Sequence, residues 1–154
     1  MSAYTVTRSA FIPAPPEQIF PLVNSFRKWT EWSPWEDVDP ALQRTYSGPE
    51  AGPGAHYEWR GNRKAGSGNM EIVESAEPNS VRIRLEFVKP FKGVNPTGFT
   101  FEPQAGGTRV TWSMTGEPQG AAKLFAKFFN MDKMVGKDFE KGLARLSQAA
   151  APKV

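Results

Sequence analysis

Residues that could carry out acid–base, nucleophilic or metal chemistry are scarce in this chain. The 154 residues include one histidine and no cysteine, which excludes disulfides, thiol catalysis and zinc sites built on cysteine. In the segment 55–61, strand alternation places His56 on the face opposite to Tyr57 and Trp59. We therefore expect no metal, no cofactor and no covalent nucleophile.

Two side chains remain as weak candidates for acid–base catalysis, Tyr57 and Asp132. Tyr57 shares the apolar face of its strand. Asp132 falls on an apolar helical stripe between Phe128 and Val135, where burying a carboxylate without a partner is costly. The simpler interpretation is that the helix kinks or begins anew here, with Asn130 as its cap and Asp132 in the first turn. The alternative makes Asp132 a polar anchor for a ligand.

Three of the five tryptophans lie within residues 25–37. Trp29 and Trp32 are three residues apart and would share one face of a short helical turn, so we expect both in the core. Pro34 keeps the preceding residue out of helical geometry. Trp35 therefore belongs to the following segment, and we expect it at the mouth of a cavity.

The rest of the chain predicts strands followed by one long helix. Residues 3–12 are rich in β-branched side chains, and residues 15–23 indicate a short or kinked helix that contains Pro21. From residue 41 onward, segments of alternating polarity are separated by turns, most clearly at 81–88, as in an antiparallel meander with one apolar face.

The C-terminal helix is indicated by apolar residues recurring at threes and fours from Leu124 to Leu146, with 149–154 as a frayed tail. Gly136 and Gly142 interrupt it, each at a cost of about 1 kcal/mol relative to alanine. They either permit a close approach to the sheet or leave the helix loose. The predicted fold class is α+β, with a curved antiparallel sheet wrapped around the long helix and two short helices after the first strand.

Composition favours one folded domain over residues 1–154, with a core spanning about 3–148. The net charge is +3 and the sequence pI is near 9.3, but basic and acidic residues are interspersed, so no nucleic-acid partner is expected. No apolar run approaches the roughly 20 residues that cross a bilayer. We expect a cytoplasmic monomer or homodimer without stable membrane insertion.

Several stretches together resemble the SRPBCC or START-like superfamily, and most closely its bacterial group labelled polyketide cyclase/dehydrase or lipid transport. They are "SAFIPAPPEQIFPLV", "FRKWTEWSPWED", "RTYSGPEAGPGAHYEWRGNRKAGSGNMEI", "GGTRVTW" and "MDKMVGKDFEKGLARL". The resemblance covers nearly the whole chain and implies the helix-grip fold. It also implies an elongated cavity between sheet and long helix for a hydrophobic or amphipathic small molecule.

The residues expected to bind that molecule are large apolar side chains of inward parity, together with the Trp35 ring and the apolar helix stripe. They are Trp35, Tyr57, Trp59, Met70, Leu85, Phe87, Phe99, Phe101, Trp112, Met114, Phe128, Met131, Val135 and Phe139. Asn95 and Thr97 are added as hydrogen-bond formers. Each aromatic could instead be ordinary core packing.

Three functions follow from these observations, in order of preference. The first is a carrier or sensor of a lipid-, aromatic- or polyketide-like molecule. The second is a cyclase or dehydratase that shapes a bound substrate without metal or covalent nucleophile. The third is a protein-interaction module, which would show an exposed apolar patch and a filled interior.

Overall fold

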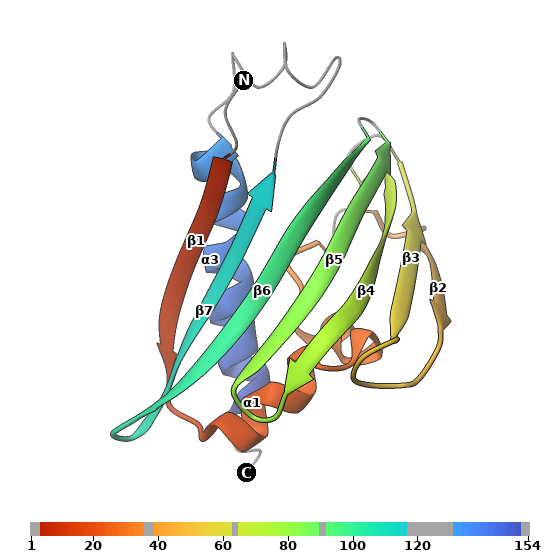
Figure 1. Ribbon diagram of the computed structural model, residues 1–154. Helices are drawn as coiled ribbons and strands as arrows, with labels where there is room; N and C mark the ends of the chain where they lie inside the picture. The colour runs from red at the N-terminus through yellow and green to blue at the C-terminus, as the bar shows by residue number, and fades with distance from the viewer. Residues whose placement is uncertain (1–3, 36–38, 63–64, 90–91, 117–130, 152–154) are drawn as a thin grey trace.

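The computed structural model describes residues 4–35, 39–62, 65–89, 92–116 and 131–151. Within these ranges, seven strands, one α-helix and one 3₁₀ helix precede a long final helix (Figure 1). In chain order these elements are β1 (Tyr4–Ile12), α1 (Pro16–Val23), η1 (Phe26–Glu31), β2 (Gln43–Ser47), β3 (His56–Arg60), β4 (Ser67–Ala76), β5 (Ser80–Lys89), β6 (Gly93–Gln104), β7 (Gly107–Gly116) and α3 (Met131–Ala150).

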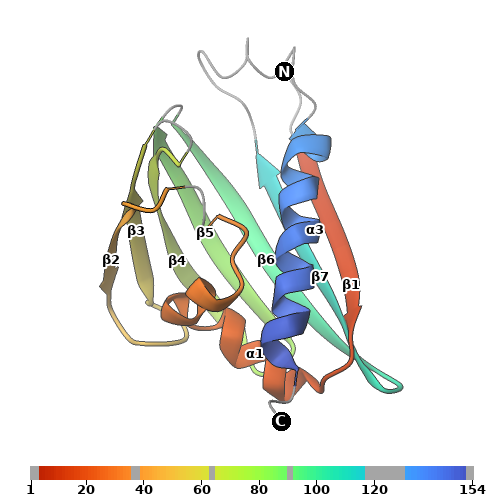
Figure 2. The ribbon, with the colours of Figure 1, turned by 180° about the vertical axis from the view of Figure 1, so that it is seen from behind.

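All seven strands form one antiparallel sheet in the order β1-β7-β6-β5-β4-β3-β2. Strands β2 to β7 follow one another as a meander, and β1 pairs with β7 at the far edge. Figure 2 shows α3 lying across one face of the sheet over β1, β7 and β6, while α1 lies at the lower end of the same face beside α3. The predicted α+β architecture is confirmed.

The helix α1 is short, as its sequence predicted. Pro16 occupies the first helical turn, where its missing N–H is no loss, and Pro21 lies inside the helix. Ile19 and Val23 are fully buried and fix α1 against the sheet. The chain then turns directly into η1.

Trp29 and Trp32 are buried, as expected, and each also satisfies a backbone carbonyl of α1. Trp29 Nε1 donates to the Val23 carbonyl over 2.9 Å, and Trp32 Nε1 donates to the Leu22 carbonyl over 2.8 Å. The last carbonyls of a helix have no partner within it. The two indoles therefore close the C-terminal end of α1 and hold η1 beneath it.

The core beside α3 is an aromatic stack centred on Trp112. The Trp112 ring is stacked on Phe139 of α3 with centroids 4.0 Å apart, and on Phe99 of β6 at 4.7 Å. Trp32 meets the same ring edge-on at 5.6 Å. This cluster joins helix, sheet and η1.

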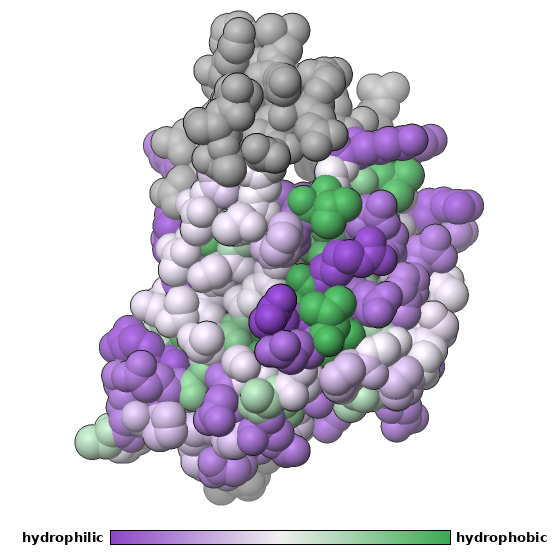
Figure 3. Space-filling model, in the orientation of Figure 1, coloured by the Kyte–Doolittle hydropathy of each residue, from purple (hydrophilic) through white to green (hydrophobic). Residues whose placement is uncertain are grey.

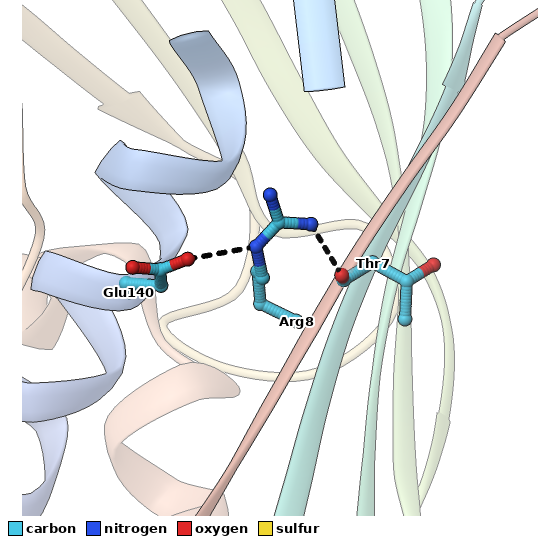
Figure 4. A network of polar contacts seen from close by, with 3 residues as sticks. All are labelled: Thr7, Arg8 and Glu140. Carbon is cyan, nitrogen blue, oxygen red and sulfur yellow. Dashed lines mark hydrogen bonds and ion pairs between the residues drawn. The ribbon is translucent and has the colours of Figure 1, made fainter. Parts of the chain in front are cut away.

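An ion pair joins α3 to the edge strand β1 (Figure 4). Arg8 Nε donates to Glu140 Oε2 over 2.8 Å, and Arg8 Nη1 donates to the Thr7 carbonyl over 2.8 Å. The helix continues to Ala150, which is buried. The expectation that the frayed tail begins at residue 149 is therefore wrong, while the predicted helical segment 124–130 lies outside the described residues.

The outer face of the sheet is largely polar, as Figure 3 shows. Three valines on it are exposed: Val73, Val88 and Val94. Ion pairs lie among them, with Arg82 bound to Glu74 on this face. Single exposed apolar side chains of this kind are normal on a protein surface.

Candidate functional site: an apolar cavity between sheet and helix

A cavity of about 200 Å³ lies where the inner face of the sheet meets η1, the segment after it and α3. Its walls are mainly aromatic and aliphatic side chains. The lining residues are Phe26, Trp29, Ser33, Trp35, Leu42, Tyr57, Trp59, Ala65, Met70, Leu85, Phe87, Met114, Val135 and Asp138. Such an apolar concavity with few polar groups is typical of a small-molecule site.

The sheet side of the cavity carries a row of aromatic rings on β3 and β5. Tyr57 and Trp59 are stacked with centroids 6.1 Å apart, and Phe87 meets Trp59 edge-on at 5.9 Å. Trp59 Nε1 donates to the Ala65 carbonyl over 2.9 Å. The indole lies so close to β4 that a β-carbon on Gly68 would stand 2.6 Å from Trp59 Cη2. A glycine at position 68 therefore lets this wall lie flat on the sheet.

The helix side of the cavity is held by a contact between Trp35 and Asp138. Trp35 Nε1 donates to Asp138 Oδ2 over 3.2 Å, and the indole meets Trp112 edge-on at 5.6 Å. Both Trp35 and Asp138 are half-buried. The backbone nearby is tied to the same helix, because Arg145 Nη1 donates to the Ser33 carbonyl over 3.0 Å.

Apart from the indole N–H groups of its tryptophans, the described lining has three polar side chains: Ser33, Tyr57 and Asp138. Only Asp138 carries a formal charge at neutral pH among the lining residues that the structure describes. Within the same described ranges, no cluster of three histidine, cysteine or acidic side chains could hold a metal ion.

Eight of the residues expected to bind a ligand line the cavity. They are Trp35, Tyr57, Trp59, Met70, Leu85, Phe87, Met114 and Val135. Phe128 lies outside the described residues, as do the side chains of Met131 and Asp132.

Four further residues were expected in the lining and are not part of it: Phe99, Phe101, Trp112 and Phe139. They are almost fully buried and pack against one another and against η1. Strand alternation correctly predicted that the three strand residues among them face the inside of the sheet. Trp29 of η1 and Trp32 directly after it pack against Phe99 and Trp112, Phe139 of α3 stacks on Trp112, and Phe20 of α1 meets Phe101. These four residues therefore form core and not wall.

Asn95 and Thr97 are buried on the inner face but are engaged with the protein and not with the cavity. Asn95 Nδ2 donates to Tyr4 Oη over 3.0 Å and to the Thr115 carbonyl over 3.1 Å, and Thr97 Oγ1 donates to the Asn95 carbonyl. Burial raises the pKa of the Tyr4 hydroxyl, and the hydrogen bond from Asn95 opposes that shift.

Sequence reasoning missed six lining residues: Phe26, Trp29, Ser33, Leu42, Ala65 and Asp138. Trp29 was assigned to the core, and it is buried, but part of its ring also reaches the cavity. Leu42 and Ala65 lie outside the strands, where alternation predicts no direction. Asp138 follows Val135 by three residues, a spacing that places both on one helix face and could have identified it.

The curved sheet, the long helix across it and the cavity between them define a helix-grip protein. The chain belongs to the family described as polyketide cyclase/dehydrase and lipid transport, whose sequence profile matches residues 3–151. The expected membership of the SRPBCC superfamily is thereby confirmed. A search of curated proteins finds no match.

Solved structures agree with this fold. The Mll3558 protein of Rhizobium loti is 16% identical with a TM-score of 0.73, covering 96% of this chain and 97% of its own. Ara h 8.0201 is 17% identical with a TM-score of 0.58, covering 97% and 95%. The di-domain ARO/CYC protein BexL of the BE-7585A biosynthetic pathway is 12% identical with a TM-score of 0.69, covering 99% of this chain and 51% of its own. At these identities the likeness establishes the fold.

Among the described helices, none has the length and apolar character that crossing a bilayer requires.

Proposed function

We propose that this protein binds a small hydrophobic or amphipathic molecule in the cavity between sheet and helix, as a carrier or sensor. The observation that carries the proposal is the cavity itself, about 200 Å³ walled mainly by aromatic rings, methionines and leucines. An apolar cavity of about 150 Å³ suffices to bind benzene. The space therefore accommodates an aromatic ring system or a short acyl segment.

Burial of the ligand would provide most of the affinity. Each 100 Å² of apolar ligand surface removed from water contributes about 2.5 kcal/mol, from which the loss of ligand freedom must be subtracted. Met70 and Met114 add adaptability, since unbranched thioether side chains repack readily around different shapes. The site is suited to a class of molecules more than to one rigid shape.

A cyclase or dehydratase activity on a polyketide-like substrate is the second candidate. It is favoured by Tyr57 and Asp138, which place a phenol and a carboxylate in the same lining. The fold is also that of an ARO/CYC protein, BexL. In that case Tyr57→Phe or Asp138→Asn would abolish turnover and retain substrate binding, whereas a carrier gives no turnover in any variant.

The first test is native mass spectrometry of the freshly purified protein, followed by solvent extraction of any adduct. A bound apolar molecule is expected. Titration with the neutral dye N-phenyl-1-naphthylamine then measures the cavity directly, because the dye fluoresces only when buried.

Two substitutions to tryptophan on β4 provide the matched comparison. Met70→Trp fills the cavity and should weaken dye binding at least about tenfold, the loss of roughly 1.4 kcal/mol. Val73→Trp adds the same ring on the exposed face of the strand and should leave binding unchanged. Equal dye affinities in both folded variants would contradict a ligand site in this cavity.

A further inference from the structure

The charge of the cavity lining is strongly one-sided. Among the described lining residues, Asp138 alone carries a formal charge. Its described hydrogen-bond partner is the neutral indole of Trp35, which occupies Oδ2. No ion pair among the described residues includes Asp138. The carboxylate therefore brings an uncompensated negative charge to an otherwise apolar site.

No described ion pair joins Asp138 to Lys137, Lys141 or Arg145, the basic residues that flank it on α3. Arg145 lies two helical turns further along α3, and its Nη1 donates to the Ser33 carbonyl. Arg8 is paired with Glu140 on the other side of the helix. The second oxygen of Asp138 accepts no hydrogen bond from any described residue.

The aromatic walls of the cavity also favour a positively charged group. Tyr57, Trp59 and Phe87 form a continuous row of rings on the sheet side, and Trp35 lines the same cavity. The faces of aromatic rings are electronegative and attract organic cations, most strongly where water is excluded. Carboxylate and ring faces thus favour a positive group and disfavour an anion at the same place.

We propose that the ligand of this cavity carries a protonated amine on its apolar body, held by Asp138 across from the aromatic row. The inference rests on the proposed ligand-binding function and specifies its chemistry. Fatty acids and other apolar carboxylates are correspondingly poor ligands, because their head group would meet Asp138 without an intervening cation. A neutral alcohol can still donate one hydrogen bond to the free carboxylate oxygen.

Three small probes that differ only in the head group test this selectivity. They are 4-phenylbutylamine, 4-phenylbutan-1-ol and 4-phenylbutyrate, each used to displace N-phenyl-1-naphthylamine at neutral pH. The expected order of affinity is amine, alcohol, carboxylate, with the amine at least about tenfold tighter than the carboxylate, since a charge-assisted hydrogen bond is replaced by like-charge repulsion.

The variant Asp138→Asn isolates the charge. Its side-chain oxygen can still accept the Trp35 hydrogen bond, and its size is unchanged, so the fold should melt as the wild type does. We expect the preference for amine over carboxylate to fall to about twofold or less, with the alcohol affinity nearly unchanged. Glu102→Gln makes the same change in net charge at an exposed position on β6 and should retain the wild-type preference.

The outcomes separate this inference from the ligand-binding proposal. Binding of all three probes with equal affinity to the wild type, or an unchanged amine preference in Asp138→Asn, would overturn the inference while the cavity remains a ligand site. If neither the dye nor any probe binds the folded protein, both proposals fail. An amine preference abolished by Asp138→Asn alone supports both.

Discussion

Gly142 of α3 lies directly against the Trp112 indole of β7. A β-carbon at position 142 would stand 2.8 Å from Trp112 Cζ3 and 2.9 Å from Pro34 Cδ. Of the two roles considered for the helix glycines, close approach is the one observed here. This approach lets the preceding turn place Phe139 face to face with Trp112 at 4.0 Å.

Gly142→Ala should destabilise the protein although alanine is the better helix former. The gain of about 1 kcal/mol in helix propensity is opposed by overpacking against two rigid rings, which costs typically about 1–3 kcal/mol. The difference between the two gives an expected fall in the free energy of unfolding in urea of up to about 2 kcal/mol.

Gly136→Ala is the matched control, because the three atoms nearest its new β-carbon all belong to the guanidinium of Arg8. That group ends a long flexible side chain and can move away, which would weaken its surface pair with Glu140, worth about 0–1 kcal/mol, and its hydrogen bond to the Thr7 carbonyl. The change in unfolding free energy should stay within about 1 kcal/mol of zero. A Gly142→Ala protein more stable than Gly136→Ala would contradict close packing of helix and sheet.

Trp112→Ala should act on stability before it acts on ligand binding. The sequence alone suggested that this residue walls the cavity, whereas its ring packs among Trp32, Phe99 and Phe139. Truncating a buried tryptophan costs about 3–5 kcal/mol, and we expect a loss of this size in chemical denaturation.

Met114→Ala provides the comparison on the same strand, since Met114 lines the cavity. It should remove less stability, about 2–3 kcal/mol, and should alter the affinity for N-phenyl-1-naphthylamine. If Trp112→Ala folds as stably as the wild type and loses only dye affinity, the ring is a cavity wall after all.

The contrast between Trp59 and Trp112 shows what strand alternation can predict about the cavity and what it cannot. Both tryptophans have inward parity, and both are inside the sheet's curve. Alternation predicts the face of a strand, but the crossing of α3 decides which part of that face is filled. That crossing brings Gly142 against the Trp112 ring, on which Trp29 and Trp32 also pack. Strand alternation predicts none of these contacts, so the sequence predicted the sheet well and the cavity boundary poorly.

The acidic group of the site illustrates a second limit. The sequence points to Asp132, because that residue interrupts an apolar stripe, whereas the carboxylate that lines the cavity is that of Asp138. Asp138 stands out in the structure because it accepts the hydrogen bond of Trp35. No periodic pattern predicts where the segment after Pro34 places that tryptophan. A contact between an irregular segment and a helix 103 residues away becomes visible only in three dimensions.

Trp32→Phe should cost more stability than its loss of volume suggests. The substitution removes the indole N–H that satisfies the buried Leu22 carbonyl at the end of α1. An unsatisfied buried carbonyl costs about 1–3 kcal/mol, and we expect a loss of about 2–3 kcal/mol in urea denaturation.

Trp35→Phe removes an indole donor as well, but from a half-buried contact with Asp138 that water can replace. Its cost should remain below about 1.5 kcal/mol. Equal losses for the two variants would show that the contact with α1 is not a stabilising one.

The stability of the protein at alkaline pH should report on Tyr4. Burial raises the pKa of its hydroxyl above the ordinary value of 10.0, and the hydrogen bond from Asn95 acts in the opposite direction. The folded state therefore keeps the proton at a pH where the unfolded chain releases it. The stability due to this group is complete below the unfolded pKa and is lost as the pH rises through the folded one.

Tyr4→Phe separates that effect from all other alkaline titrations. At pH 8 the variant should be less stable by about 0.5–1.5 kcal/mol, since the hydrogen bond with Asn95 is lost. Phenylalanine does not ionise, so the difference between wild type and variant should shrink as the pH rises above about 10. Urea denaturation of both proteins at pH 8 and pH 11 measures it, and a difference that stays constant or grows would show that the Tyr4 hydroxyl is not held in its neutral form by burial.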